Sequence, residues 1–399
     1  MSFWRERIWS SVRRRRVRPF ILGLRDSIPE AASLSSKEIY RLAGRNTGNF
    51  VFTAAIRSQV ANWGDPPNVA LRAASARLGE KGGICVIPGA NKLGPHMDMG
   101  AAAEVLQNAR TPVVTVSLGA QSNVDYRVPE IPEGTLRWVK AIADRRWGSV
   151  ENIGVRGDFP RRVLAAYGFD RVRVIGCPSF FLNPTDRLGE LIARNAAAMP
   201  TRVAVAAGGP GRRHLSRIES SLAQIVTETA GAYICQAPFT MVALARGDFG
   251  ALSEAELEAC REYVDGATSI SAFTSWIRRH ARVFFDVWTW MEFLRGFDFV
   301  VGTRIHGVLM GIQVGVPGIC VVSDSRTREL CETMDIPHVL SRDHRDGLDR
   351  VELMGLFREQ FDAGRFDSKR RRLAANYLTF LEGNGLTVKG SLRSLARAA

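Results

Sequence analysis

The feature that most constrains the fold of this chain is a recurring unit of a short apolar strand, a glycine-containing loop and a helix. Strands of this kind are predicted at residues 84–87, 113–116, 152–155 and 173–175 in the first half, and at 202–206, 232–235, 283–285, 297–301 and 318–322 in the second. Short β-rich runs that alternate with helices are typical of a parallel, doubly wound sheet. In such sheets ligands bind at the carboxyl ends of the strands, so we expect functional residues in these loops.

The length of 399 residues exceeds that of a usual single domain, so two hydrophobic cores are expected. The two series of strands are of similar size and meet near residue 180. We predict an α/β fold of two Rossmann-like domains that face each other across a cleft. The expected parts are a basic N-terminal arm at 1–40, an N-terminal Rossmann-like domain at 41–178, a C-terminal Rossmann-like domain at 179–350, and C-terminal helices at 351–399.

Much of the net charge of +14 lies in the first 25 residues, which hold eight arginines and one acid, Glu6. In this segment Trp4, Ile8 and Val12 have helical spacing. One interpretation is an interfacial helix attracted to anionic lipid, and the other is a solvated arm. The apolar run at 19–24 is too short for a signal peptide core, and no run reaches the roughly 18–20 residues of a membrane span. We expect a cytoplasmic protein, with the arm as a candidate peripheral contact to the inner membrane.

The six cysteines and six histidines show none of the spacings that are typical of metal sites. We interpret the cysteines as reduced core residues, and we expect neither a metal nor a cofactor. The basic residues are not interleaved with aromatic residues in the pattern of a nucleic-acid-binding module. A nucleic acid partner is therefore not expected.

The segment from residue 297 to residue 329 carries the most chemical information. A buried strand is predicted to end at Gly302, with Thr303 as a candidate helix cap and Arg304 and His306 in the first helical turn. The free amides and the dipole of that turn favour an anion, and a guanidinium group suits phosphate or carboxylate. The helix start and Arg304 disfavour a charged His306, whereas a bound phosphate would favour it. The alternative is a structural histidine that bonds a neighbouring carbonyl.

Residues 297–307, Phe-Asp-Phe-Val-Val-Gly-Thr-Arg-Ile-His-Gly, resemble the D-x-V-V-x-x-R-x-H-G signature of the polysaccharide pyruvyl transferases. Further segments with family-like patterns are Gly-Val-Pro-Gly-Ile at 315–319, Ser-Asp-Ser-Arg-Thr-Arg-Glu-Leu at 323–330, Asn-Thr-Gly-Asn at 46–49, Val-Arg-Gly-Asp at 155–158 and Cys-Pro-Ser-Phe at 177–180. Two departures concern acids: Asn49 and Cys177 stand where the family has an acidic residue.

The resemblance implies a glycosyltransferase-B-like fold and phosphoenolpyruvate as the donor substrate. It also implies a cyclic pyruvate ketal on two hydroxyls of a sugar, in a glycan or lipid-linked oligosaccharide acceptor for the cell surface. His306 is then the acid or base at the enolpyruvyl group. The implied substrate-binding residues are Arg156, Arg304, Asn46, Asn49 and Arg326, the last of which stands where many relatives have lysine.

The sequence leaves several points open. No base for the sugar hydroxyl is assigned, although Asp158, Asp298 and Asp324 flank the motifs. The loop 208–214 holds Arg212, Arg213 and His214 as candidates for contact with an anionic acceptor, and a plain turn is the alternative. Two other functions fit the same fold: a nucleotide-sugar-dependent glycosyltransferase and a non-catalytic glycan-assembly protein.

Overall fold

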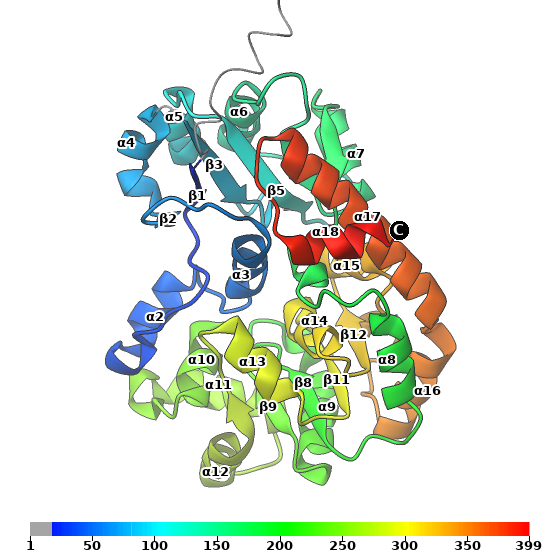
Figure 1. Ribbon diagram of the computed structural model, residues 1–399. Coiled ribbons are helices and arrows are strands. Elements are labelled where there is room, and N and C mark those ends of the chain that lie inside the picture. The colour runs from blue at the N-terminus through cyan, green and yellow to red at the C-terminus, as the bar shows by residue number, and fades with distance from the viewer. Residues whose placement is uncertain (1–17, 81, 399) are drawn as a thin grey trace, which may run out of the picture.

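The computed structural model describes residues 18–80 and 82–398. Two parallel sheets, each covered by helices, form two α/β domains that lie one above the other in Figure 1. The expected glycosyltransferase-B-like architecture, two Rossmann-like domains, is thereby confirmed. In the first sheet the order is β2 (Asn68–Val69), β1 (Arg18–Leu22), β3 (Gly83–Pro88), β5 (Val113–Ala120), β6 (Ile153–Val155) and β7 (Val172–Val174), with β4 (Asn91–Leu93) paired to β5.

Strand β1 differs from the sequence prediction, because residues 18–22 were expected within the basic arm. The strand pairs in parallel with β3, with Phe20 opposite Cys85, and both side chains are buried. The apolar run at 19–24, which is too short for a signal peptide core, is long enough for a buried strand. The first domain therefore begins before residue 41. The predicted interfacial helix, with Trp4, Ile8 and Val12, lies outside the described residues.

The second sheet has the order β10-β9-β8-β11-β12-β13, and all of its pairs are parallel. Its strands are β8 (Val203–Ala206), β9 (Ala232–Ile234), β10 (Ala281–Arg282), β11 (Phe299–Gly302), β12 (Gly318–Val322) and β13 (His338–Leu340). The strand predicted at 283–285 lies two residues earlier, because Phe284 instead stacks on the buried Trp290. Edge strand β13 was not predicted, since three residues carry little periodic signal.

The helices that follow the strands cover both faces of each sheet. In the first domain they are α3 (Asn49–Gln59), α4 (Ala74–Gly79), α5 (Gly100–Gln107), α6 (Glu133–Ala143) and α7 (Asp158–Ala166), whereas α2 (Ser36–Leu42) packs on α10 (Phe239–Ala245) of the second domain. In the second they are α8 (Leu188–Asn195), α9 (Ser216–Glu228), α10, α11 (Glu254–Asp265), α12 (Ile270–His280), α13 (Val287–Leu294), α14 (Ile305–Gln313), α15 (Ser325–Met334) and α16 (Arg350–Gln360). No helix in this part of the chain is long and apolar enough to cross a bilayer.

Successive side chains of a strand point to opposite faces, and β3 shows how this divides the core. Ile84 and Val86 belong to a hydrophobic cluster that continues through α3 into the second domain. Cys85 and Ile87 belong to a separate cluster under α5, α6 and α7. One face of the first sheet thus shares its core with the second domain, which limits how far the two domains can move apart.

The C-terminal helices connect the two domains along one side of the molecule (Figure 1). Helix α17 (Ala363–Gly383) starts beside the second domain, and its buried Arg370 donates from Nε to the carbonyl of Phe180 at 2.9 Å. Asn384 follows the helix and donates to the carbonyl of Glu151 in the first domain at 2.8 Å. Helix α18 (Gly390–Arg397) ends the described chain, and the preceding Lys389 N–H bonds the carbonyl of Gln59 at 2.8 Å. These bonds fix the relative position of the sheets.

Helix α15 forms a second connection between the domains, through hydrogen bonds to residues of the first domain. The amide of Ser122 donates to Ser325 Oγ at 2.8 Å, and Tyr126 Oη donates to Glu332 Oε2 at 2.7 Å. The amide of Phe159, at the start of α7, donates to the carboxyl of Glu329 at 2.9 Å. The carboxyl edges of both sheets are therefore held face to face.

Candidate active site

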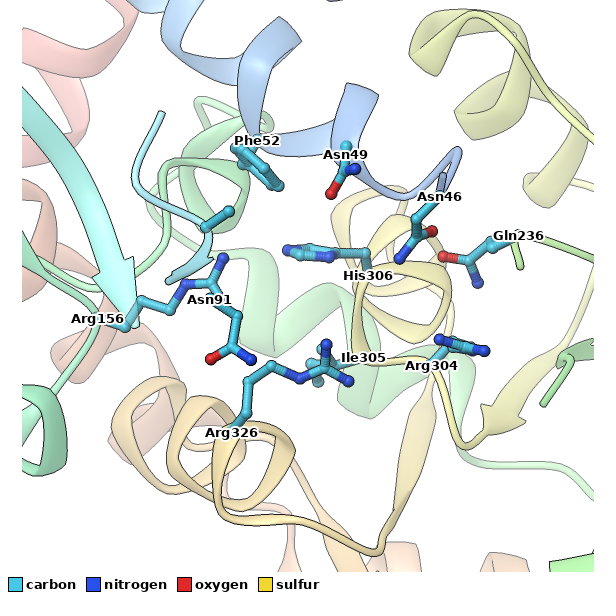
Figure 2. Close-up of a pocket in the computed structure, with 11 residues that line it drawn as sticks. Asn46, Asn49, Phe52, Asn91, Arg156, Gln236, Arg304, Ile305, His306 and Arg326 are labelled. Carbon is cyan, nitrogen blue, oxygen red and sulfur yellow. The ribbon is translucent and has the colours of Figure 1, made fainter. Parts of the chain in front are cut away.

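All six residues that the sequence singled out line one pocket between the domains (Figure 2). The first domain contributes Asn46, Asn49 and Arg156, and the second contributes Arg304, His306 and Arg326. The other lining residues are Phe52, Ala90, Asn91, Gln236 and Ile305. The cavity volume is about 50 Å³, which suits a small anion.

Three arginines converge on this pocket and come from the carboxyl ends of three strands. Arg156 follows β6, is 2% exposed, and donates from Nε to the carbonyl of Ser117 at 3.1 Å. Arg304 follows β11 and donates to the carbonyl of Ala237 at 3.1 Å. Arg326 lies in the first turn of α15, and its buried Nε has no hydrogen-bond partner. No lining residue is acidic. Arg326 is paired with Asp324, outside the lining, at 3.5 Å, whereas Arg156 and Arg304 form no ion pair with a carboxylate among the described residues.

Burial lowers the pKa of two of these guanidinium groups. It lowers the pKa of Arg304 to about 10, with smaller contributions from the neighbouring Arg326 and Arg212. It also lowers the pKa of Arg156. Arg156 has in addition the ring of Phe52 beneath it, with 5.8 Å from Cζ to the ring centroid. Arg304 therefore keeps its charge near neutral pH.

His306 stands between these cations, in the first turn of α14. Its ring lies 5.5 Å from that of Phe52, centroid to centroid, and its Nε2 is 3.8 Å from the sulfur of the buried Cys177. Burial first, and then Arg156 and Arg326, hold the pKa of His306 well below its ordinary value. The imidazole is consequently neutral near neutral pH in this structure. The direction agrees with the sequence argument, but the causes are burial, Arg156 and Arg326 and not the expected Arg304.

The start of α14 differs from the predicted cap. Arg304, not Thr303, occupies the N-cap position, and its side chain makes no capping hydrogen bond. The backbone at Gly302 has φ of +152°, a conformation that glycine adopts readily, and it turns the chain one residue later than expected. No side chain therefore caps the backbone amides of the first turn of α14, which lies at the pocket.

Gly307 brings α14 close to β8 and so sets the height of His306 in the pocket. A Cβ at this position would lie 2.5 Å from Ala206 Cβ and 2.7 Å from Gln236 Nε2. Any larger residue would push the helix off the sheet. Gly307 therefore affects the site indirectly, because it determines the position of the adjacent His306.

Asn46 and Asn49 belong to the loop that leads into α3, and both help to hold its shape. Asn46 Oδ1 accepts from the amide of Gly48 at 2.8 Å, and Asn49 Nδ2 donates to the carbonyl of Ala43 at 3.0 Å. The amide of Thr47 donates to the carbonyl of Gln236 in the second domain at 3.1 Å. These bonds place the two asparagines above His306 in Figure 2.

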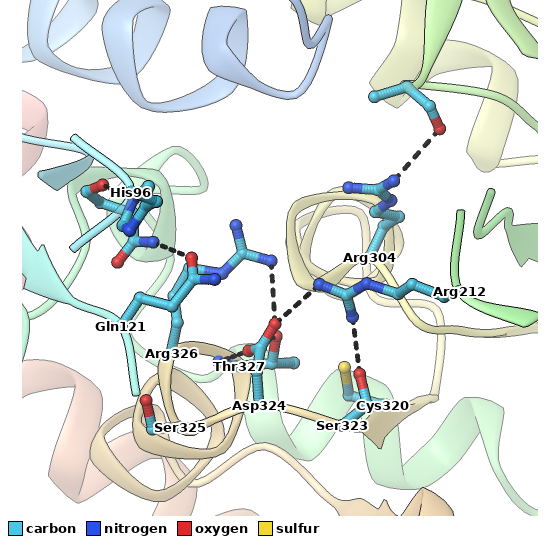
Figure 3. Close-up of polar contacts among 12 residues, drawn as sticks. His96, Gln121, Arg212, Arg304, Cys320, Ser323, Asp324, Ser325, Arg326 and Thr327 are labelled. Atoms are coloured by element: carbon cyan, nitrogen blue, oxygen red, sulfur yellow. Dashed lines mark hydrogen bonds and ion pairs between the residues drawn. The ribbon is translucent and has the colours of Figure 1, made fainter. Parts of the chain in front are cut away.

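None of the three aspartates considered as a base lines the pocket. Asp158 is exposed and pairs with Arg161, and Asp298 accepts from the amide of Thr201 at 3.0 Å. Asp324 pairs with Arg212 at 2.9 Å and with Arg326 at 3.5 Å (Figure 3). Burial acts to raise the pKa of Asp324, but Arg326 and Arg212 outweigh it and hold the pKa far below its ordinary value. Asp324 is a permanent counter-charge and not a proton acceptor.

The sequence did not single out Phe52 or Gln236, and it noted Asn91 only as part of a glycine loop. Gln236 Nε2 and Asn91 Oδ1 are buried and have no hydrogen-bond partner. Buried polar atoms without a partner are rare in folded proteins and point to a ligand. Among the described residues, no group of three His, Cys, Asp or Glu side chains is arranged to hold a metal ion.

Comparison with known proteins adds the family. Among curated proteins, none matches this chain. Solved structures of similar fold include one described as a UDP-N-acetylglucosamine 2-epimerase from Listeria monocytogenes, with 13% identity, a TM-score of 0.42, and coverage of 92% of this chain and 94% of that one. Another is MnaA of S. aureus in a co-structure with UDP, with 11% identity, a TM-score of 0.43, and coverage of 92% and 94%. The sequence model of one family, polysaccharide pyruvyl transferase, matches residues 46–325, which span every residue that lines the pocket except one, Arg326. The chain belongs to the polysaccharide pyruvyl transferase family.

Proposed function

We propose that this protein transfers the pyruvyl group of phosphoenolpyruvate to two hydroxyls of a sugar in a cell-surface or exopolysaccharide precursor, with formation of a pyruvate ketal. The observation that carries the proposal is the pocket with three arginines, one neutral histidine and no lining carboxylate. Phosphoenolpyruvate has a phosphate and a carboxylate, with about three negative charges in total. Its charge and small size complement this pocket.

The surroundings of each arginine support a division of roles. Arg304 and the start of α14 suit the phosphate, because uncapped amides and a guanidinium group both bind that anion. Arg156 belongs to the opposite domain and suits the carboxylate. Arg326 acts on both His306 and Arg304, since it lowers the pKa of each. In Figure 2, Arg156 and Arg304 appear on either side of His306.

The chemistry begins with a proton that His306 takes up from water when the donor binds. The negative charge of phosphoenolpyruvate offsets the two arginines that disfavour the imidazolium, so donor binding raises the pKa of His306. The imidazolium then protonates the methylene carbon, and an oxocarbenium-like centre forms at the adjacent carbon. General acid catalysis of this kind is typically worth about 10²- to 10⁴-fold.

The remaining steps return the proton and need no second base. The first sugar hydroxyl attacks the oxocarbenium carbon and gives its proton to the now neutral His306. The bond from that carbon to the phosphate oxygen then breaks, the second hydroxyl closes the ketal, and its proton leaves with the phosphate. One hydroxyl proton thus ends on the new methyl group and the other on phosphate. The lack of a carboxylate among the lining residues supports this single-histidine cycle.

The reaction as written uses no metal and no cofactor. Because phosphoenolpyruvate is an intracellular metabolite, the proposal places the protein in the cytoplasm. The proposed acceptor is a glycan or a lipid-linked oligosaccharide. For a lipid-linked acceptor, we also propose that the basic N-terminal arm contacts the inner membrane.

The test separates donor binding from turnover. In the purified protein, we expect His306→Gln to keep phosphoenolpyruvate binding within a few-fold by calorimetry, and Arg304→Ala to weaken it by at least about tenfold. In the parent organism, we expect His306→Gln to remove one pyruvate-derived mass increment per repeat unit from the polymer. Inert phosphoenolpyruvate together with turnover of a nucleotide sugar would instead establish a glycosyltransferase. An unchanged polymer in the His306→Gln strain would favour a non-catalytic assembly protein.

A further inference from the structure

A second cavity opens at the same edge of the second domain, outside the active-site pocket. Its volume is about 520 Å³, against about 50 Å³ for the pocket around His306. Half of the eight lining residues are arginines, and the lining comes from two segments: Arg213, His214, Leu215, Ser216, Arg217, Ser341, Arg342 and Arg345. We refer to this as the rim cavity.

The two walls of the rim cavity are fixed by the fold. The first wall follows β8 and includes the start of α9, and the second follows β13 and includes η6 (Ser341–Asp343). Because the strands of this sheet are parallel, both walls lie at the carboxyl edge that also carries the active site. The walls are joined where the amide of Leu348 donates to Ser221 Oγ on α9 at 3.0 Å.

The charges of the rim cavity are open to a ligand. Within the described residues, Arg213 and Arg345 form no ion pair with a carboxylate. Arg217 pairs with Asp346 at 3.0 Å, but both side chains are largely exposed, at 77% and 93%. Arg342 pairs with Asp125 of the first domain at 3.3 Å, again at the surface. Exposed pairs of this kind contribute about 0–1 kcal/mol, so phosphate oxygens can replace the carboxylates at little cost.

A row of charged side chains joins the rim cavity to the active site. Arg212 precedes Arg213 and donates to Ser323 Oγ at 2.6 Å and to Asp324 Oδ2 at 2.9 Å. Asp324 lies 3.5 Å from Arg326, which lines the active-site pocket (Figure 3). The rim cavity is thus linked to the active-site pocket through Arg212, Asp324 and Arg326.

We propose that the rim cavity binds the diphosphate group of the acceptor, while the sugar extends toward His306. The inference rests on the proposed function, in that the acceptor is a diphosphate-linked sugar. Four guanidinium groups on two walls fit two phosphates, each of which can take paired N–H donors.

The experiment measures binding of inorganic pyrophosphate to the full chain by calorimetry at low salt. We expect the exposed pair Arg213→Gln and Arg345→Gln to weaken it at least about tenfold. Arg279→Gln, at an exposed arginine on α12 outside the cavity, is the matched control and should change nothing. Phosphoenolpyruvate binding should also be unchanged by the double variant. Measuring both ligands separates the two proposals. If the proposed pyruvyl transfer is wrong, phosphoenolpyruvate shows no activity although pyrophosphate still binds.

Two further titrations identify the source of the diphosphate. Tighter binding of uridine diphosphate than of pyrophosphate supports a nucleotide-linked acceptor, and tighter binding of farnesyl diphosphate in neutral phospholipid vesicles supports a lipid-linked one. Pyrophosphate affinity that is equal in the double variant, the control and the unmodified protein would overturn the proposal. Full competition between pyrophosphate and phosphoenolpyruvate would overturn it too, since both would then occupy the pocket around His306.

Discussion

Replacement of Cys177 by aspartate tests the electrostatic account of His306. The thiol sulfur is 3.8 Å from His306 Nε2 and is fully buried. A carboxylate near this point attracts an imidazolium by about 4 kcal/mol, when Coulomb's law is applied at 3.8 Å with an effective dielectric constant of about 20. That attraction corresponds to a rise of about 3 units in the pKa of His306. Arg156 also attracts the carboxylate and so keeps it ionised, and we therefore expect a rise of about 3 units in the pKa of His306.

Histidine ring NMR of the purified protein measures this shift. In the unmodified protein His306 should remain neutral through the mildly acidic range, because its pKa lies well below the ordinary value. In Cys177→Asp the same signal, assigned by its loss in His306→Gln, should titrate at a clearly higher pH than in the unmodified protein. The acidic limb of the pH profile of kcat/KM should move in the same direction. Cys177→Asn has nearly the shape of the aspartate without the charge, and is the matched control.

Equal titration of His306 in the aspartate and asparagine variants would refute the reasoning. It would mean that position 177 does not act on the ring through charge, and that burial and the arginines alone set its pKa. Thermal unfolding of both variants checks that each keeps the fold. The comparison remains valid if both lose stability equally, because the readout is the difference between them.

Three further predictions concern buried charges around the site. Burial raises the pKa of Glu329 to about 8 from 4.5, so the stability from its protonated form is present below about pH 4.5 and is lost as pH rises through 8. In urea unfolding, the free energy of unfolding of Glu329→Gln should therefore exceed that of the unmodified protein by about 3 kcal/mol near neutral pH, with no difference below about pH 4.5. A difference that does not change with pH would contradict this prediction. Arg326→Lys should raise the KM for phosphoenolpyruvate about tenfold, since the charge stays but the paired donors are lost. Glu219→Gln should cost about 1–3 kcal/mol in unfolding, because the carboxylate accepts from Gly208 N, Tyr233 Oη and Tyr263 Oη, and an amide cannot accept from all three.

The sequence located the active-site loops because the fold class determines where strand ends meet. Arg156, Arg304 and Arg326 each come within four residues of the end of a predicted strand. In parallel sheets these ends share one edge, so residues far apart in the chain are brought together. The structure places all three in one pocket with His306.

Other features left no local pattern to find. Phe52 lies inside a helix and Gln236 follows a strand of three residues, so neither differs from ordinary core or loop positions. Their role depends on the facing domain, which the sequence does not place at this precision. Strand β1 was hidden because the arginines that precede it made residues 18–22 look like part of the arm. The helix cap was displaced by one residue because the conformation of Gly302 is set by its contact with β8.

The chemical role of the site follows from what surrounds His306. In the proposed reaction, desolvation and two arginines keep the ring neutral, and the negative charge of phosphoenolpyruvate favours its protonation, so the acid forms only after the donor has bound. Bridges through α15 and α17 already hold the two halves of the pocket in place, and a site that is organised before binding loses little in reorganisation. Donor binding therefore precedes proton transfer, and an acceptor that meets the site without donor meets a neutral histidine that cannot start the reaction. Under the proposed mechanism such a site does not protonate an acceptor that arrives alone, and it thereby sets the order in which donor and acceptor can react.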